Sequence, residues 1–327
     1  MPANHAADEV RPFEPADLDA AARLLAERHR RHRLAELLLD PAYEDPAATR
    51  VEIEALLRAD KAAGWVGLRD GAVAGYLIGV AKSELMWGAN VWVEAAGHAA
   101  EDGAILRDLY AVAAAVWVDE GRTNHHALVP ASDAELIDAW FSLDFGQQHL
   151  HAVVEAPPAT FGVTPRGELI VRAAALDDVP ALIELERVLP MHLMASPVFS
   201  RLSVDPEDQI EAELRADLVD PTYQFFMAEH EGRVIGTSIA CSLEVSSGAT
   251  ALNRPDNAGY LAYAAVLPDA RGLGAGRALG DAVLAWSRDQ GYRSVATDWR
   301  STNIEADRAW RGMGFRPTFR RLHRLIG

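Results

Sequence analysis

Apolar positions recur along the chain at alternate residues in some segments and every three to four residues in others, which predicts strands interleaved with helices. Asp177 or Asp178 can cap a helix that runs to about residue 188, and Pro206 suits the first turn of a second helix. The pattern then predicts a hairpin at 224–229 and 233–243, a strand at 260–266, a helix at 277–290, a strand at 294–299 and a helix at 303–311. We therefore predict an α/β fold with a mixed sheet, of the α+β kind.

The first half of the chain shows the same pattern as the second. Val10-Arg11-Pro12 matches Val171-Arg172-Ala173 at an offset in numbering of 171 − 10 = 161, and Trp140 matches Trp310 at an offset of 310 − 140 = 170. The larger offset places about nine extra residues, 170 − 161, in the turn-rich segment 246–259. We predict tandem domains at residues 1–160 and 161–327, joined by the proline-containing segment 156–167.

The segment 266–277 ends an apolar strand, turns on glycines and opens a helix. Gly272, Gly274 and Gly276 carry no Cβ, so backbone N–H groups can close on an anion at the positive end of the helix. Arg271 and Arg277 add positive charge beside these glycines. The segment therefore predicts a cradle for a diphosphate.

A dinucleotide-binding fold is the competing interpretation of the glycines, because Asp298 follows them at about 20 residues. However, Arg277 stands where that fingerprint has its third glycine, and only about 30 residues follow Asp298. Too little chain remains for a doubly wound domain. A glycine turn without a ligand is disfavoured by the two arginines at a helix start.

Two motifs resemble the GNAT superfamily of N-acyltransferases, and the resemblance extends over nearly the whole chain as two tandem GNAT-like domains. Val266-x-Pro268-x-x-Arg271-Gly272-x-Gly274-x-Gly276 is similar to the family's pyrophosphate-binding signature for acetyl-coenzyme A (acetyl-CoA), and Asn303-x-x-Ala306 with Met313-Gly314-Phe315 is similar to its closing helix motif. The resemblance implies a gap between the strands that end near Val266 and Trp299, which holds the donor's pantetheine arm. It also implies that a backbone N–H near Val266 or Leu267 polarises the thioester carbonyl, and that Asn303 hydrogen-bonds the arm. The residues thus expected to bind acetyl-CoA are Val266, Leu267, Arg271, Gly272, Leu273, Gly274, Ala275, Gly276, Arg277 and Asn303.

Proton transfer is where the chain departs from the family. The resemblance implies a tyrosine general acid on the last helix, but Trp310 stands there, and its indole N–H is expected to pack instead. The strand 260–266, where the family often keeps a catalytic glutamate, has no carboxylate. The candidate catalytic residues are Tyr263, Asp298 and Tyr260, although the tyrosines also suit strand packing and Asp298 also suits a cap for the turn at 300–303. Alternation of side chains predicts that Tyr260 and Tyr263 point to opposite faces of the sheet.

His192 and Glu244 are the candidate residues for binding the acceptor. We expect His192 in the loop after the first helix of the second half, and the resemblance implies that this loop roofs the acceptor site, although an ordinary surface histidine fits as well. The formal net charge of −17 favours a cationic amine acceptor, small molecule or peptide, and disfavours non-specific binding to nucleic acid.

The first half lacks the features of the cradle. An offset of 170 places Glu101 and Asp102 opposite Arg271 and Gly272, and Asp133 opposite Asn303. Two carboxylates suit a helix N-terminus but repel a pyrophosphate. We therefore expect the first half to be a degenerate copy that supports the second half without binding the donor.

Composition sets the remaining expectations. The longest apolar run, residues 109–118, is too short to span a membrane, and residues 1–9 do not resemble a signal peptide, so we expect a cytoplasmic protein with no membrane partner. Cys241, the single cysteine, is expected to be a buried core thiol. The histidine pairs at 125–126 and at 149 and 151 lack accompanying ligands, so no metal is expected. A monomer with two similar domains and a homodimer both remain open.

These observations predict an N-acetyltransferase that moves an acetyl or short acyl group from acetyl-CoA to an amine by direct attack in a ternary complex. The absence of the family's usual tyrosine and glutamate leaves a non-catalytic CoA-binding sensor or scaffold as the alternative.

Overall fold

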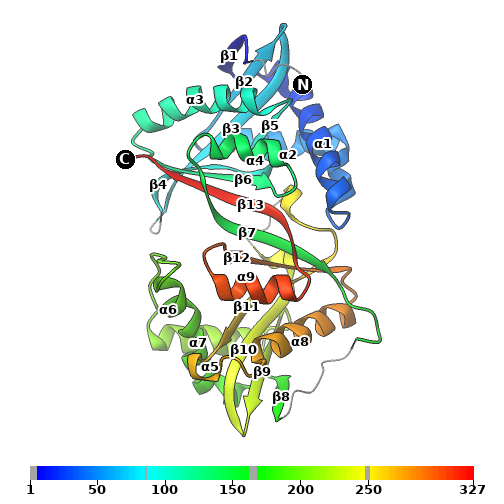
Figure 1. Cartoon of the computed structure of the whole chain (residues 1–327), viewed down its shortest axis with the longest axis vertical. Helices are drawn as coiled ribbons and strands as arrows, with labels where there is room; N and C mark the ends of the chain where they lie inside the picture. The colour runs from blue at the N-terminus through cyan, green and yellow to red at the C-terminus, as the bar shows by residue number, and fades with distance from the viewer. Residues whose placement is uncertain (1–5, 85–86, 162–167, 247–250) are drawn as a thin grey trace. The chain divides into compact units, whose positions relative to one another are not determined.

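The computed structural model describes residues 6–84, 87–161, 168–246 and 251–327, and these form an α/β fold with a mixed sheet. The chain divides into two compact units (Figure 1). Unit 1 comprises Met1–His151, Thr250–Arg254 and Pro317–Gly327, and unit 2 comprises Ala152–Ala249 and Pro255–Arg316. Within the described residues, none of the helices combines the length and the apolar character that crossing a bilayer requires.

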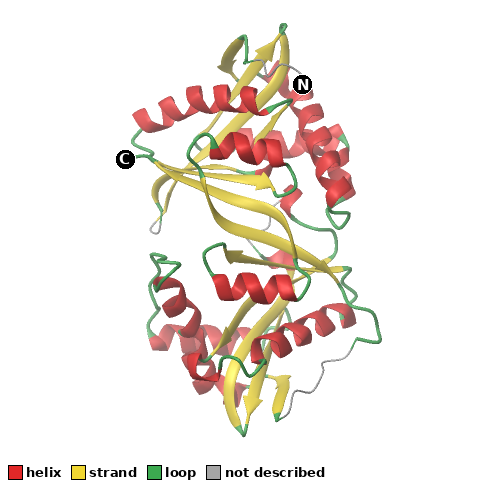
Figure 2. Ribbon diagram, in the orientation of Figure 1, coloured by secondary structure: helices red, strands yellow, loops and turns green. Residues whose placement is uncertain are grey.

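Unit 1 is a mixed sheet flanked by helices (Figure 2). Its strands follow the order β1-β2-β3-β4-β6-β13, and β5 also pairs with β3. The strands are β1 (Glu9–Pro12), β2 (Ala62–Arg69), β3 (Ala72–Glu84), β4 (Gly88–Val93), β5 (His98–Ala100), β6 (Asn124–Pro130) and β13 (Arg316–Leu325), and β7 (Gly146–Glu155) begins in this unit. The helices are α1 (Leu18–Ala35), α2 (Pro46–Leu57), α3 (Gly103–Asp119) and α4 (Ala134–Phe141).

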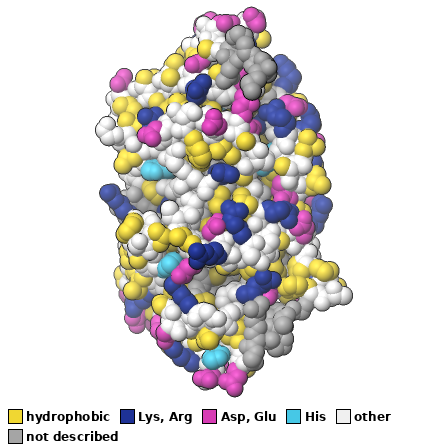
Figure 3. Space-filling model, viewed as in Figure 1, with side chains coloured by type: hydrophobic (Ala, Val, Ile, Leu, Met, Phe, Trp, Pro, Cys, Tyr) yellow, Lys and Arg dark blue, Asp and Glu magenta, His cyan; other side chains and the backbone are white. Residues whose placement is uncertain are grey.

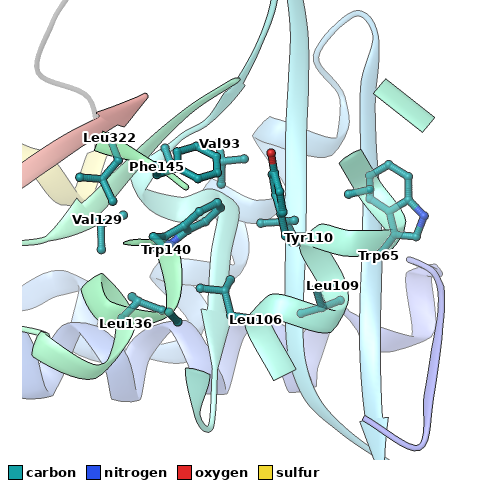
Figure 4. Packing of buried hydrophobic residues seen from close by; sticks show 14 of the residues in the cluster. Trp65, Val93, Leu106, Leu109, Tyr110, Val129, Leu136, Trp140, Phe145 and Leu322 are labelled. Carbon is teal, nitrogen blue, oxygen red and sulfur yellow. The ribbon is translucent and has the colours of Figure 1, made fainter. Parts of the chain in front are cut away.

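The two faces of this sheet carry separate apolar cores. Figure 4 shows the core under α3 and α4, in which Trp140 packs against Phe145 with ring centroids 4.7 Å apart. Leu77 of β3 belongs to this core, whereas its neighbours Tyr76 and Ile78 belong to the core under α1 and α2. Alternation along β3 therefore supplies both faces, as expected for a strand covered on both sides.

Unit 2 has a similar order of elements, although three helices rather than two separate its first strand from its second. Its strands follow the order β12-β11-β10-β9-β8, and an apolar core includes Leu182, Leu214 and Leu279 from its helices. The strands are β8 (Leu169–Ala173), β9 (Tyr223–His230), β10 (Arg233–Ser242), β11 (Ala258–Val266) and β12 (Ser294–Arg300). The helices are α5 (Val179–Glu186), α6 (Val188–Met194), α7 (Glu207–Asp217), α8 (Ala275–Asp289) and α9 (Ile304–Gly312).

The repeat is visible in individual contacts as well as in the order of elements. The guanidinium of Arg11 donates two hydrogen bonds of 2.7 Å to the carboxylate of Asp17. Arg172 donates two hydrogen bonds to Asp178 in the same way, also at 2.7 Å each. The two pairs are related by the same offset of 161 in numbering. Each aspartate also accepts a backbone N–H three residues before it, which fixes the entry to the first helix of each repeat.

The last strand of each repeat does not stay with its own half. β13, at the end of the second repeat, pairs antiparallel with β6 of unit 1, while the end of β7 belongs to unit 2, where the N–H of Ala156 donates to the carbonyl of Arg293 at 3.0 Å. The compact units therefore differ from a simple division of the sequence into halves. The boundary near residue 160 stays a prediction, and residues 162–167 of the predicted linker lie outside the described residues.

Candidate active site

The strands β11 and β12 part at their carboxyl ends, as the resemblance implied. Their parallel pairing covers Ala258–Tyr260 opposite Ser294–Ala296, although β11 runs on to Val266 and β12 to Arg300. Beyond Tyr260, the hydroxyl of Thr297 donates a hydrogen bond of 3.0 Å to the carbonyl of Leu261. A gap between two strands therefore leads towards the start of α8.

The glycine segment between β11 and α8 has the backbone geometry that the predicted cradle requires. Gly272 and Gly274 both adopt a left-handed backbone with φ of 87°, which only glycine takes at little cost. Gly274 is the N-cap of α8, and no side chain of the described residues caps the helix there. The nearest atom that a Cβ at Gly276 would meet is Val266 Cγ2 at 3.8 Å, an ordinary contact, so glycine here leaves room in front of the helix rather than relieving a clash. The first N–H groups of α8 are thus open to an anion.

The two arginines beside the cradle are held differently. Arg271, about one third exposed, donates from Nη1 to Glu305 Oε1 at 2.9 Å. Arg277 donates from Nε to Asp281 Oδ1 at 2.8 Å and from Nη1 to the carbonyl of Gly312 at 3.0 Å, so it links α8 to α9. Arg271 is therefore the arginine better placed to turn towards a bound anion.

One of the two backbone N–H groups expected to polarise a thioester is already used. The N–H of Leu267 donates to the carbonyl of Ile235 at 2.9 Å, so it cannot serve as an oxyanion donor. Val266 lies next to it on the ladder, opposite Gly236. Alternation along an antiparallel pair turns the N–H of Val266 away from β10 and towards the gap. The candidate donor is therefore Val266.

The corresponding helix start in unit 1 is closed by side chains of the protein. Asp102 caps α3 by accepting from the N–H groups of Ala104 at 2.9 Å and Ile105 at 3.1 Å, and Glu135 Oε1 accepts from the N–H of Gly103 at 3.1 Å. Arg69 pairs with Asp102 at 2.7 Å. Carboxylates of the chain therefore occupy the positions that an anionic ligand needs.

A β-bulge changes the faces on which the two tyrosines lie. Cys241 of β10 is opposite Tyr260, and Ile239 is opposite Tyr263, with the register shifted between Ile239 and Ala240. Residues paired across antiparallel strands share a face, so Tyr260 and Tyr263 point to the same face of the sheet. The simple alternation expected from the sequence was wrong here, because the bulge absorbs one residue of β11.

The hydroxyls of both tyrosines are engaged. Tyr260 donates to Asp298 Oδ1, which brings two of the predicted catalytic residues together. Tyr263 donates to the carbonyls of Leu185 at 2.9 Å and Glu186 at 3.2 Å, so it contacts the end of α5 instead. Burial, followed by the negative charge of Asp298 or Glu186 respectively, raises the pKa of both hydroxyls above their ordinary range. Both tyrosines are therefore neutral at pH 7.

His192 lies in the helix α6 rather than in the expected loop, and it contacts predicted donor-binding residues. Its Nε2 is 3.2 Å from Asn303 Oδ1, and its Nδ1 is 3.4 Å from Nη2 of Arg271. These partners fit the tautomer in which Nε2–H donates to the amide oxygen and Nδ1 accepts from the guanidinium. Asn303 Oδ1 also accepts the N–H of Ala306 at 3.2 Å, so it caps α9. Glu244 is exposed in a short 3₁₀ turn after β10.

Trp310 packs, as expected from its counterpart in the first repeat. Its side chain is 9% exposed, and its ring meets Phe315 edge-on with centroids 6.1 Å apart, matching the pair formed by Trp140 and Phe145. The structure thus supports a packing role for the tryptophan that replaces the family's tyrosine.

The sequence did not single out Glu186, the last residue of α5. Burial, with smaller contributions from Asp217 and Glu213 of α7, raises the pKa of Glu186 to about 7. In the sequence it resembles any glutamate on the polar face of an amphipathic helix, because the neighbours that bury it come from distant segments.

One surface group of the described residues brings three possible metal ligands together, two glutamates and one histidine. Glu168, His230 and Glu231 each place one ligand atom within 4.8 Å of the others. Such groups are common among exposed acidic side chains, and this one lies at the turn after β9 rather than at the gap.

The chain resembles known proteins in sequence and in fold. Residues 190–315 match the family model described as the acetyltransferase (GNAT) family. The chain is 35% identical over 119 residues to the aminoglycoside N(6')-acetyltransferase type 1 of Stenotrophomonas maltophilia, a match that covers 36% of this chain and 74% of that relative. It is 34% identical over 113 residues to the mycothiol acetyltransferase of Cellulomonas flavigena, covering 33% of this chain and 31% of that protein. In structure it resembles a GCN5-related N-acetyltransferase from Sphaerobacter thermophilus, with a TM-score of 0.57 and 16% identity over 98% of this chain and 97% of the other.

Proposed function

Since the chain belongs to the GNAT family of acetyltransferases, we propose that unit 2 transfers an acetyl or short acyl group from acetyl-CoA to an amine by direct attack in a ternary complex. The observation that carries this proposal is the contrast between two equivalent helix starts. At the start of α8, two glycines have a left-handed backbone and no side chain of the described residues caps the helix. At the start of α3, the carboxylates of Asp102 and Glu135 accept hydrogen bonds from the first backbone N–H groups. One donor molecule therefore binds per chain, in unit 2.

In this proposal, backbone N–H groups and Arg271 hold the donor. Its pyrophosphate accepts from the first N–H groups of α8, and Arg271 leaves Glu305 to pair with it. The pantetheine arm lies in the gap beside β11, where Asn303 also contributes, and the N–H of Val266 stabilises the oxyanion. The remaining cradle residues are Leu267, Gly272, Leu273, Gly274, Ala275, Gly276 and Arg277.

Tyr260 and Asp298 are the pair that we propose for proton transfer to the leaving thiolate. In this step the neutral hydroxyl of Tyr260 turns from Asp298 to the sulfur and donates its proton as negative charge develops there, and Asp298 keeps the hydroxyl in place until then. Tyr263 is already bound to backbone carbonyls, which favours a role in holding the end of α5 beside β11.

The acceptor in this proposal is a cationic amine of low molecular weight or on a peptide. Two relatives are named for small-molecule acceptors, as an aminoglycoside acetyltransferase and a mycothiol acetyltransferase, and this supports a small-molecule acceptor here. Acidic and basic side chains are interspersed on the face in Figure 3, so local groups rather than one broad acidic patch must select the amine there. His192 and Glu244 are the proposed acceptor contacts. We further infer a cytoplasmic protein, as a monomer or homodimer, since Cys241 is a buried free thiol and acetyl-CoA is the donor.

Release of free thiol from acetyl-CoA in the presence of single amines tests the proposal. Turnover that depends on the amine, with one CoA bound per chain in isothermal titration, is the expected result. Binding of CoA without thiol release for any amine would instead identify a non-catalytic sensor or scaffold, the alternative that engagement of both tyrosine hydroxyls favours. Two CoA molecules per chain would contradict the assignment of the open cradle to unit 2.

A further inference from the structure

The carboxylate at the end of α5 occupies a position that is apolar in the other repeat. Glu186 Oε1 is buried and has no hydrogen-bond partner in the part of the chain that the structure describes. The equivalent position, 186 − 161 = 25, is Leu25, which is 0% exposed in the core under α1 and α2. The second repeat thus places a carboxylate with one buried, unpartnered oxygen where the first repeat packs a leucine. Such a departure from the local packing rule is typical of a functional group.

The charged groups around Glu186 do not neutralise it. Asp217 and Glu213 face it from α7, and both are acidic. Arg187 follows it in sequence, but its Nη2 pairs with Glu207 Oε2 at 3.1 Å. Glu186 is also the last residue of α5, where the helix dipole disfavours negative charge. A cation or a proton is therefore the missing partner of this carboxylate.

Tyr263 fixes the backbone of Glu186 beside the bulge of β11. Its hydroxyl donates to the carbonyls of Leu185 and Glu186, and its neighbour Ala262, at the bulge, is exposed. By this point in the chain, β11 has already left its pairing with β12 at Tyr260. The end of α5 is thus held against the same stretch of strand along which the donor arm is proposed to lie.

We propose that Glu186 binds the ammonium group of the acceptor and takes its first proton. This inference rests on the acyl transfer proposed above. The ammonium R–NH₃⁺ passes one proton to the Glu186 carboxylate, which later releases it to water. The free amine forms its C–N bond with the thioester carbon, and the C–S bond breaks. Tyr260 gives a proton to the thiolate and regains one from the second proton that leaves nitrogen, so the products are the amide and CoA thiol.

The acid strength of Glu186 suits this step. Burial and the two acidic neighbours raise its pKa to about 7, and a general base works best when its pKa lies near the working pH. A bound ammonium favours the ionised carboxylate and lowers that pKa again, so binding the amine itself prepares the base. Tyr263, with a raised pKa, remains neutral and does not compete for the proton.

The test compares wild type with Glu186→Gln, Glu186→Leu and a control, Glu184→Gln, whose side chain is exposed on the same helix. Kanamycin, spermidine and Nα-acetyl-lysine amide serve as amine probes, titrated into the CoA complex and assayed for thiol release between pH 5.5 and 9. We expect both Glu186 variants to bind CoA within twofold of wild type, to bind amines about tenfold more weakly and to lose about 100-fold in kcat/KM. The rise of kcat/KM with pH near 7 should vanish in Glu186→Gln and persist in Glu184→Gln.

The outcomes separate this inference from the proposed function. Glu186 variants with wild-type amine affinity and an unchanged pH profile would overturn the role of Glu186 while leaving acyl transfer intact. If wild type binds amines but releases no thiol, the proposed acyl transfer is overturned. In that case, weaker amine binding by Glu186→Gln than by wild type still supports recognition of the ammonium group by Glu186. Wild type that binds none of the three probes would overturn the inference. Glu186→Leu, which reproduces the apolar residue of the first repeat, guards against misfolding as the cause of any loss.

Discussion

Replacing Glu186 by glutamine should change how the stability of unit 2 depends on pH. The carboxyl has a pKa of about 7 in the folded state against an ordinary value of 4.5. A raised carboxyl pKa means that the folded state holds a proton more tightly than the unfolded chain. Its contribution to stability is therefore complete below pH 4.5 and is lost as the pH rises through 7. Glutamine does not ionise, so the variant keeps its stability over this window.

The difference between the two pKa values sets the size of the effect. A difference of about 2.5 corresponds to about 3 kcal/mol, at about 1.4 kcal/mol for each pH unit, and partial access of solvent to the side chain makes this an upper limit. For a unit of this size, about 3 kcal/mol shifts the melting temperature by about 6–12 °C. Glu186→Gln should thus melt close to wild type at pH 5 and well above it at pH 8.

Thermal unfolding of the ligand-free protein at half-unit steps from pH 4.5 to 8.5 measures this difference. Subtracting the two curves removes the pH dependence of all distant carboxylates, because those residues are common to both proteins. Melting curves that stay parallel from pH 5 to pH 8 would refute the reasoning, since they would show that Glu186 ionises normally in the folded state. Glu184→Gln, at an exposed position, should track wild type throughout.

The remaining predictions concern the two helix starts. Gly274→Ala places a Cβ on a left-handed backbone and should cost about 1–2 kcal/mol in unfolding free energy and weaken CoA binding in titrations, whereas Gly312→Ala, with open space and no positive φ, should do neither. Arg271→Ala should weaken CoA binding about tenfold at low salt, a loss that disappears in high salt if the arginine pairs with phosphate. Glu305→Gln, which frees Arg271, should instead tighten CoA binding, and unchanged affinity would contradict the proposed exchange of partners. Asp102→Ala removes the cap of α3 and should lower stability by about 1 kcal/mol in denaturant unfolding without altering CoA affinity.

The elements that local pattern determines were predictable. The helix after the glycines, the hairpin of β9 and β10 and the glycine turn before α8 follow from periodicity and from glycines that favour a left-handed backbone, and the structure has all three. The repeat was equally readable, because Arg172 and Asp178 stand at the same spacing as Arg11 and Asp17 and make the same local contact. Each of these signals lies within a short stretch of chain.

The features that were missed depend on distant segments. The bulge that brings Tyr260 and Tyr263 to one face arises from the pairing of β11 with β10, and no local pattern in residues 258–266 indicates it. Glu186 is faced by Asp217 and Glu213 of α7, a helix well separated from α5 along the chain, so its sequence context resembles a solvated helix face. His192 lies in a helix because α6 begins two residues after α5 ends, where the sequence suggested a loop.

The assignment of β13 to unit 1 and of the end of β7 to unit 2 has a consequence for how the two repeats depend on each other. β13, which completes the sheet of unit 1, is encoded at the end of the second repeat, and the end of β7, which unit 2 requires, is encoded in the first. A deletion that removed either repeat from the gene would leave the survivor without its last strand. The two repeats are therefore coupled in folding, because each unit contains strand residues that the other repeat encodes. On the proposal that only unit 2 binds the donor, the first repeat contributes to folding through the strand residues that it supplies.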